Sequence, residues 1–201
     1  MNNKQWLVNF DQRLAIHDKL MEVPEQDRAS WITDPKGYLF LDVDGILNPS
    51  LARLDGDWRL EQAGLFQVWI SPSLNCWLQY LIDNGIQIVW ATTWVEIPVD
   101  LAELAERLGL AADLPRIDKL VWQGNYECGK RAGVNTWLLQ HKVNPAEVPV
   151  AWADDQLGIG DIAWANENDV HPIKVPPRLG LADLFQRERI ENALGVGITV
   201  Q

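Results

Sequence analysis

The stretch YLFLDVDG, residues 38–45, decides the fold class of this chain. Its first four residues are apolar, and a run that is apolar on both faces is typical of a strand buried in a parallel sheet. Asp42 and Asp44 follow directly where this strand ends. Ligands of open α/β sheets bind beyond the carboxyl ends of the strands. The stretch therefore predicts a buried parallel strand that delivers two carboxylates to a binding crevice.

Strands and helices alternate along the rest of the chain. Apolar runs predict strands at 86–91, 117–122, 148–153 and about 173–175; helical spacing predicts helices at about 72–84, 99–108, 130–141 and 181–194, with one more beginning near residue 160. Ser71 is the predicted N-cap of the first helix, and Gly85 its end. Pro149 counts against a central position for its strand, although proline is tolerated near a strand's start. The alternation predicts a doubly wound, mostly parallel α/β sheet.

Two segments stand outside this alternation. Residues 1–36 are polar with scattered apolar side chains and predict a helical N-terminal appendage, which leaves 37–201 as a single α/β domain. Residues 50–70 predict a small β-hairpin flap, whose turn is expected at Asp55-Gly56-Asp57.

The composition is typical of one globular domain. The 201 residues are 47% hydrophobic and carry 17 Lys and Arg against 28 Asp and Glu, a formal net charge of −11. Nucleic acids and anionic membranes are polyanions, so this charge disfavours both as partners. Cys76 and Cys128 are too few for a disulfide framework and are expected to be free thiols. Without a signal-peptide pattern or an apolar run of about 20 residues, the chain is expected to be cytoplasmic.

Three of the predicted strands end in residues suited to phosphoryl transfer. Asp42 and Asp44 follow the first, Thr92 the second, and Asp154-Asp155 the strand at 148–153. Carboxylates gathered at one point repel one another, and Mg²⁺, a hard ion that prefers oxygen, is the expected cation among them. One carboxylate can attack phosphorus while a second carboxyl transfers protons. A hydroxyl and an ammonium can hold the non-bridging oxygens as charge develops.

Four motifs in this order resemble the haloacid dehalogenase (HAD) superfamily of phosphohydrolases, which has a Rossmann-like core. They are the strand with Asp-x-Asp-Gly at 39–45, the strand ending in Thr92 at 88–92, Lys130 at the start of a helix, and the acidic pair after the strand at 150–153. The phrases DVDGILNP (42–49) and WATTW (90–94) are similar to small bacterial HAD domains associated with predicted RNA-repair proteins.

The resemblance implies catalytic roles for four residues. Asp42 is the expected nucleophile and Asp44 the general acid and base. An acid at position 44 is typical of family members that hydrolyse phosphate esters, whereas the dehalogenases lack it. Thr92 is expected to bind the phosphoryl group, and Lys130 to offset the charge of nucleophile and phosphate. Lys119, on the preceding predicted strand, is the alternative lysine.

The resemblance also implies a metal site and neighbouring substrate contacts. Asp42, the backbone carbonyl of Asp44, and Asp155 are the expected Mg²⁺ ligands, and the pattern leaves open whether Asp154 or Asp155 touches the metal directly. Asp161 is a candidate supporting acid in the same loop.

Three further residues are candidates for contact with the substrate. Thr93 competes with Thr92 for the phosphoryl group, and Trp94 and Trp58 are candidates for stacking on a base or ring. Packing is the favoured interpretation for both tryptophans, as for most of the 11 in the chain.

The intervals between the motifs are too short for a large cap domain, so an open site is expected, with room for a bulky substrate or for a lid from a partner or from residues 1–36. We expect a Mg²⁺-dependent phosphatase that acts through an aspartyl-phosphate on a nucleotide or small phosphometabolite. The first alternative is a nucleic-acid-end (3′-) phosphatase in RNA or DNA repair, for which Arg53, Arg59 and Arg131 are candidates for a local basic rim. The second is a non-catalytic binding or regulatory protein, against which the intact motif set argues. The oligomeric state is left open.

Overall fold

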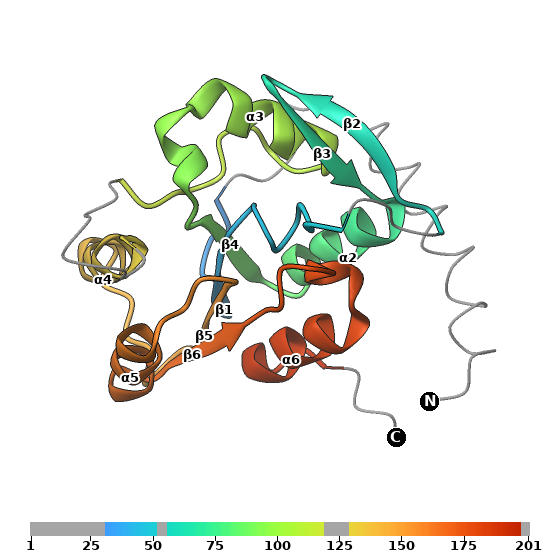
Figure 1. The fold of residues 1–201 in the computed structure, drawn as a ribbon. Helices are drawn as coiled ribbons and strands as arrows, with labels where there is room; N and C mark the ends of the chain where they lie inside the picture. Colours follow the sequence, from blue (N-terminus) through green and yellow to red (C-terminus); the bar gives the residue numbers. More distant parts are fainter. Residues whose placement is uncertain (1–30, 52–55, 119–128, 198–201) are drawn as a thin grey trace.

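Four parallel strands form the central sheet of the computed structural model, which describes residues 31–51, 56–118 and 129–197 (Figure 1). The strands are β1 (Gly37–Leu41), β4 (Ile86–Trp90), β5 (Val150–Asp154) and β6 (Val170–Lys174), in the spatial order β4-β1-β5-β6. The predicted doubly wound α/β class is confirmed, and the stretch at 38–41 lies inside the sheet.

Helices cover both faces of this sheet. Figure 1 shows α2 (Pro72–Asp83) and α6 (Leu184–Leu194) on one side, and α4 (Lys130–Gln140) and α5 (Ile159–Glu167) on the other. A fifth helix, α3 (Pro98–Arg107), packs into the same apolar core as α2 and α6.

Alternate residues of β1 supply the two apolar cores. Leu39 and Leu41 belong to the core beneath α2 and α6, whereas Phe40 belongs to the core beneath α4 and α5. All three are fully buried, as the uninterrupted apolar run of β1 requires.

The tryptophans mostly pack, as predicted. Trp58 packs against the core beneath α2 and α6, and Trp90 and Trp152 are among the largest fully buried side chains of the described residues. Trp77, Trp94 and Trp137 are buried as well.

Helix α2 begins and ends where the sequence predicts. The Ser71 hydroxyl accepts a hydrogen bond from the backbone N–H of Leu74, Pro72 is the first helical residue, and Gly85 follows the helix with φ +85°. Asp57 also supports this helix start: its carboxylate accepts from the Ser71 hydroxyl and from the backbone N–H of Ser73, both at 2.9 Å.

The predicted hairpin is present, but the prediction of its turn is wrong. Strands β2 (Arg59–Ala63) and β3 (Phe66–Ile70) pair antiparallel with Ala63 opposite Phe66, so the turn is Gly64-Leu65 and not 55–57. Gly64 has φ +56°, the left-handed conformation that two-residue hairpin loops favour. Asp57 instead accepts hydrogen bonds at the start of α2.

The remaining elements follow the predicted order with shifted bounds. Pro149 does not keep β5 from the sheet interior, because it lies just before the strand and its carbonyl accepts from the Tyr38 N–H. For the strand predicted at 117–122, Ile117 N–H donates to the Trp90 carbonyl, and residues 119–122 lie outside the described residues. β6 begins at Val170, earlier than predicted, and the short helices η2 (Thr93–Glu96) and η3 (Gly180–Ala182) were not predicted.

Most of the predicted N-terminal appendage and Cys128 lie outside the described residues. Within the described ranges, no helix is both long enough and apolar enough to span a bilayer.

We expect Asp57→Ala to lower the free energy of unfolding by about 1 kcal/mol, because the N-terminal turn of α2 loses an acceptor and a favourable charge. Urea unfolding measures the change. The matched control is Asp83→Ala, which removes an exposed carboxylate from the other end of α2 and is expected to change stability by less than about 0.5 kcal/mol. Equal losses in the two variants would contradict the capping role.

Candidate active site

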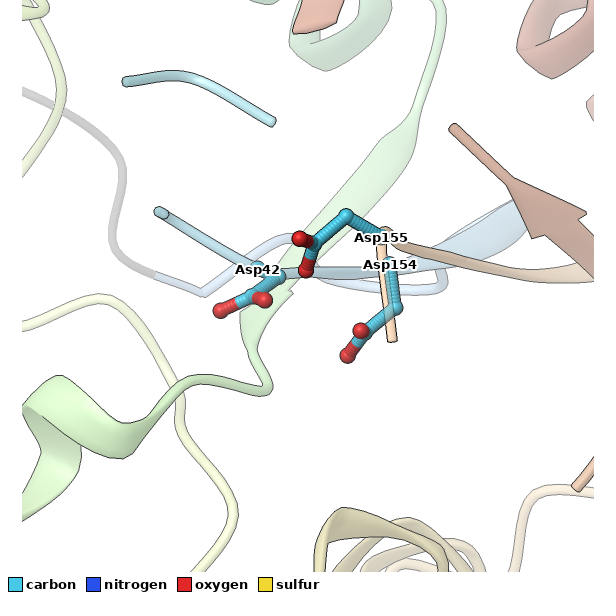
Figure 2. A group of neighbouring side chains, drawn as sticks. All are labelled: Asp42, Asp154 and Asp155. Atoms are coloured by element: carbon cyan, nitrogen blue, oxygen red, sulfur yellow. The ribbon is translucent and has the colours of Figure 1, made fainter. Parts of the chain in front are cut away.

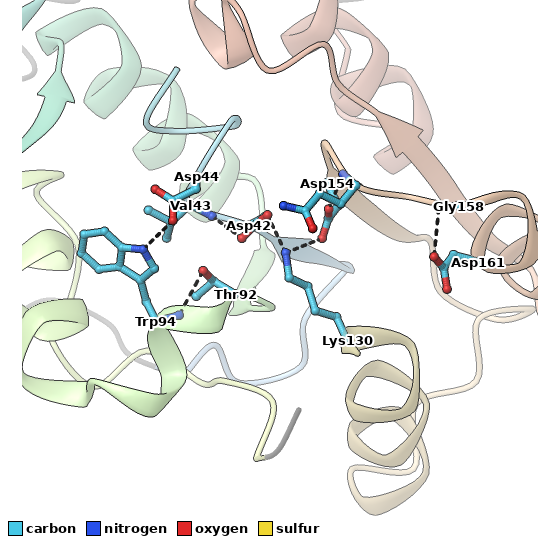
Figure 3. A network of polar contacts seen from close by, with 10 residues as sticks. Asp42, Val43, Asp44, Thr92, Trp94, Lys130, Asp154, Gly158 and Asp161 are labelled. Carbon is cyan, nitrogen blue, oxygen red and sulfur yellow. Dashed lines mark hydrogen bonds and ion pairs between the residues drawn. The ribbon is translucent and has the colours of Figure 1, made fainter. Parts of the chain in front are cut away.

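The predicted motif residues meet at the carboxyl edge of the sheet. Asp42 directly follows β1, Asp154 ends β5, and Lys130 begins α4 (Figure 3). The register fixes this convergence, because Leu41 pairs with Trp90 on one side and with Ala153 on the other. The next residue along each strand therefore reaches the same level of the sheet.

A buried lysine joins two of the carboxylates. The ammonium of Lys130 lies 2.5 Å from Asp42 Oδ2 and 2.8 Å from Asp154 Oδ2. The three residues are between 0% and 4% exposed, so these charges interact with little screening by water. The structure thus places Lys130 at the site, whereas the alternative Lys119 lies outside the described residues.

Three carboxylates share this pocket with that single ammonium. Asp42, Asp154 and Asp155 each offer an oxygen within 4.8 Å of the others (Figure 2). One positive charge does not balance three buried or half-buried negative charges, and a hard divalent cation is the usual solution in such a site. The donor set, three carboxylates, fits Mg²⁺.

The two adjacent aspartates differ in their contacts. Both oxygens of Asp154 already accept, one from Lys130 and the other from the backbone N–H of Gln156 at 2.8 Å. Asp155 Oδ1 is buried and has no hydrogen-bond partner among the residues that the structure describes. An orphaned carboxylate oxygen beside Asp42 is the feature that a metal ligand shows in the absence of its ion.

The pocket raises the pKa of its acids. Burial is the main cause that raises the pKa of Asp42 from 3.8 to about 7, and repulsion from Asp154 is the second. Lys130 and the Val43 N–H, which donates to Asp42 Oδ1 at 2.8 Å, act in the opposite direction. Burial and the charge of Asp154 also raise the pKa of Asp155. Holding both acids ionised therefore costs free energy that a bound cation offsets.

Gly45 lets the Asp155 carboxylate approach the loop after β1. Its φ is +73°, and a Cβ at this position would lie 2.6 Å from Asp155 Oδ2 and 2.9 Å from Pro177 Cβ. The glycine of the Asp-x-Asp-Gly stretch is thus required both for its backbone conformation and for the space it leaves to Asp155.

The two threonines of the WATTW stretch differ in exposure. Thr92 is fully buried, and its hydroxyl accepts from the Trp94 backbone N–H at 3.3 Å, whereas Thr93 is exposed. Because Leu41 pairs with Trp90 and the Ala91 N–H donates to the Leu41 carbonyl, Thr92 lies one residue beyond the level of Asp42 at the same edge of the sheet.

Asp44 stands apart from the three clustered carboxylates. It is exposed, and its Oδ2 accepts from the Trp94 indole N–H at 2.9 Å. Its Oδ1 accepts from the Asn48 side-chain amide at 3.4 Å. Neither donor was predicted from the sequence, although Asn48 stands four residues after Asp44 in the DVDGILNP phrase.

The indole of Trp94 is buried, which fits packing better than the candidate role of stacking on a substrate. The side chain is 3% exposed, and its ring packs on that of Phe66 with centroids 4.6 Å apart. Packing, the favoured interpretation, is what the structure has.

Asp161 also differs from its predicted role. It is fully buried, and its carboxylate accepts from the Gly158 N–H at 2.9 Å at the start of α5. It lies outside the carboxylate group found among the described residues, and Arg131 Nε lies 3.9 Å from it. Asp161 therefore caps a helix.

Of the other arginines considered for a basic rim, Arg59 lies 3.8 Å from Glu61, and Arg53 is outside the described residues.

Comparison with known proteins finds one matching family model. The family model described as "HAD domain in Swiss Army Knife RNA repair proteins" matches residues 38–184. No curated protein matches. Among solved structures, a hypothetical protein from Xanthomonas campestris aligns with 17% identity and a TM-score of 0.42, over 81% of this chain and 84% of the other.

We expect Gly45→Ala to destabilise the protein and to weaken Mg²⁺ binding, because the new methyl group displaces Asp155. Gly195→Ala is the matched control: Gly195 has φ +68°, yet nothing lies within 4 Å of its added Cβ. Both variants should lose about 1–2 kcal/mol to backbone strain, as measured by urea unfolding. Only Gly45→Ala should also lose Mg²⁺ affinity in calorimetric titration. Equal Mg²⁺ affinity in the two variants would contradict the proposed displacement.

We expect the free energy of unfolding, measured in EDTA, to fall as the pH rises from about 4 to about 7. The pKa of Asp42 is higher in the folded protein, so the folded state keeps a proton that the unfolded chain releases over this interval. Below pH 4 both states hold the proton, and above pH 7 neither does. Asp42→Asn should lack this part of the decline, whereas Asp83→Asn, an exposed acid, should retain it. An unaltered pH dependence in Asp42→Asn would refute the assignment.

Proposed function

Because the chain belongs to the family of HAD domains in Swiss Army Knife RNA repair proteins, we propose that it is a Mg²⁺-dependent phosphatase that hydrolyses a phosphate monoester through a phosphorylated Asp42. The single observation that carries the proposal is the buried arrangement of Lys130 between Asp42 and Asp154, next to the unpartnered oxygen of Asp155. A charge arrangement of this kind suits a dianionic ligand once a cation is present.

Asp42 acts as the nucleophile in this proposal. Its carboxylate attacks phosphorus, the bond from phosphorus to the ester oxygen breaks, and Asp44 gives its proton to the departing oxygen. The ionised Asp44 then takes a proton from water as the water oxygen attacks the phosphorus of the aspartyl-phosphate. Phosphate leaves, Asp42 is regenerated as a carboxylate, and Asp44 has its proton back.

Lys130 and Thr92 stabilise the charge of the phosphoryl group. The ammonium of Lys130 already lies against the nucleophile, so it offsets negative charge on Asp42 and on the incoming phosphate. Thr92 supplies a buried hydroxyl one residue beyond the level of Asp42, and the exposed Thr93 is a second hydroxyl beside it.

Asp42, Asp155 and the backbone carbonyl of Asp44 would hold Mg²⁺. The metal supplies positive charge that screens the phosphate from the carboxylates and polarises its oxygens. We favour Asp155 over Asp154 as the direct ligand because Asp154 is engaged by Lys130 and Gln156, whereas one Asp155 oxygen has no partner.

A nucleotide or a small phosphometabolite is the substrate class that the acidic chain favours, since a net charge of −11 opposes long polyanions. RNA with a terminal phosphate is the second candidate, and the description of the matching family favours it. The hairpin β2–β3 is the only accessory element between β1 and α2 in the described residues, which leaves room for either.

We expect wild-type protein to release phosphate from p-nitrophenyl phosphate with Mg²⁺ and not with EDTA, and Asp42→Asn to lose the activity by at least about a hundredfold. Asp57→Asn, a substitution near α2, is the control and should retain turnover. Hydrolysis that persists in Asp42→Asn or in EDTA would refute the mechanism.

The same assay separates the two substrate classes and the non-catalytic alternative. Nucleoside monophosphates and short oligoribonucleotides with a 3′- or 5′-phosphate are compared at equal concentration. A higher kcat/KM on the mononucleotides supports the first class, and a higher value on the oligonucleotides supports the second. Mg²⁺ binding without turnover of any substrate would support the remaining alternative, a non-catalytic binding protein on a HAD scaffold.

A further inference from the structure

Asp44 is an exposed acid whose carboxylate is nonetheless held in one orientation. Trp94 Nε1 donates to Asp44 Oδ2 at 2.9 Å, a normal length for a good hydrogen bond, and Asn48 Nδ2 reaches Oδ1 at 3.4 Å. Both partners are neutral donors, so they fix the carboxyl group without contributing a charge. An exposed carboxylate without such contacts samples several rotamers.

Trp94 is well placed to fix Asp44 because its own position is fixed. Its side chain is 3% exposed and packs on Phe66, and its backbone N–H donates to the Thr92 hydroxyl (Figure 3). One residue thus contacts both the proposed acid and the proposed phosphate-binding threonine. Its indole ring, being buried, has no face available to a substrate.

The hairpin β2–β3 supports both donors. Phe66 of β3 packs on the Trp94 ring, and the Asn48 side-chain oxygen accepts from the Trp69 backbone N–H of β3 at 3.2 Å. The turn of the hairpin is itself attached to α3, because Gly64 N–H donates to Glu103 at 2.8 Å. The orientation of Asp44 therefore depends on the hairpin as well as on the loop that follows β1.

We propose that Trp94 is a positioning residue, which holds the Asp44 carboxyl group through its indole N–H in the orientation that transfers a proton to the leaving oxygen. The proposal rests on the phosphatase function proposed above and adds a residue to its proton-transfer step. Trp94 is not a catalytic residue in this account, since it acts only through Asp44.

The proposal predicts a dependence on the leaving group. p-Nitrophenolate departs without a proton, whereas an alkoxide needs one from a well-oriented acid. Loss of the indole N–H should therefore impair hydrolysis of an alkyl phosphate far more than hydrolysis of p-nitrophenyl phosphate. A merely structural role would lower both rates by the same factor.

The test compares Trp94→Phe with Trp152→Phe. Trp94→Phe keeps an aromatic ring against Phe66 but removes the donor to Asp44. Trp152 is a fully buried tryptophan whose indole N–H has no acceptor within the described part of the chain, so its replacement controls for the loss of ring volume. We expect Trp94→Phe to lower kcat/KM on glycerol phosphate at least about tenfold and kcat/KM on p-nitrophenyl phosphate by less than about threefold, because kcat/KM excludes hydrolysis of the aspartyl-phosphate, in which Asp44 serves both esters as the base. Trp152→Phe should lower both by one common factor. A common factor for Trp94→Phe as well would overturn the proposal.

A second measurement does not depend on turnover. In the nuclear magnetic resonance spectrum of tryptophan indole groups, Asp44→Ala should move the Trp94 N–H resonance upfield and leave those of Trp90 and Trp152 in place. An unmoved Trp94 resonance would overturn the proposed contact, and this result can be read even if the protein shows no activity. Absence of turnover by wild type on every substrate, with the resonance shift observed, would instead refute the proposed function.

Discussion

The site depends on the contact that Lys130 makes with Asp42 and Asp154. Removing a carboxylate from water without a counter-charge costs several kcal/mol, and Asp42 and Asp154 are almost completely buried. An ammonium at 2.5 and 2.8 Å is therefore a condition for this part of the fold to form with its charges intact. The three residues belong to the ends of β1 and β5 and to the start of α4, so the contact also attaches α4 to the sheet edge.

The same contact leaves the pocket short of positive charge, and this shortage has structural consequences. Asp155 sits beside Asp154 with one oxygen unpartnered, and burial raises its pKa. Gly45 leaves the space into which that carboxylate fits. A pocket arranged in this way is costly without a cation and favourable with one, so the ion and the phosphate are expected to stabilise each other's binding.

The sequence predicts those features that arise from short-range patterns at regular spacing. The apolar run of β1, the Ser71 cap and the polar residues at three strand ends were all recognisable, because each depends on neighbouring residues. The hairpin turn was misplaced because Asp55-Gly56-Asp57 and Gly64-Leu65 are both acceptable turn sequences. Only the tertiary structure shows that Asp57 instead accepts a hydrogen bond at the start of α2. Trp94 donating to Asp44 joins residues fifty positions apart, which no local pattern reveals. The role of Asp161 was missed for a related reason: an acid at the third position of a helix is equally suited to capping and to an acidic cluster.

The proposed nucleophile and the proposed acid are held by different kinds of interaction. Asp42 is fixed by an ion pair and a backbone N–H in a buried pocket, so its position follows from the sheet itself. Asp44 is exposed and is fixed by two neutral donors, Trp94 and Asn48, both of which contact β3. A displacement of the hairpin would therefore disturb the contacts of Asp44 while the ion pair of Asp42 with Lys130, which involves no hairpin residue, stays in place. The described residues contain no large cap, so in the proposed mechanism this arrangement would make proton transfer, more than attack on phosphorus, the step through which the hairpin influences which esters are hydrolysed.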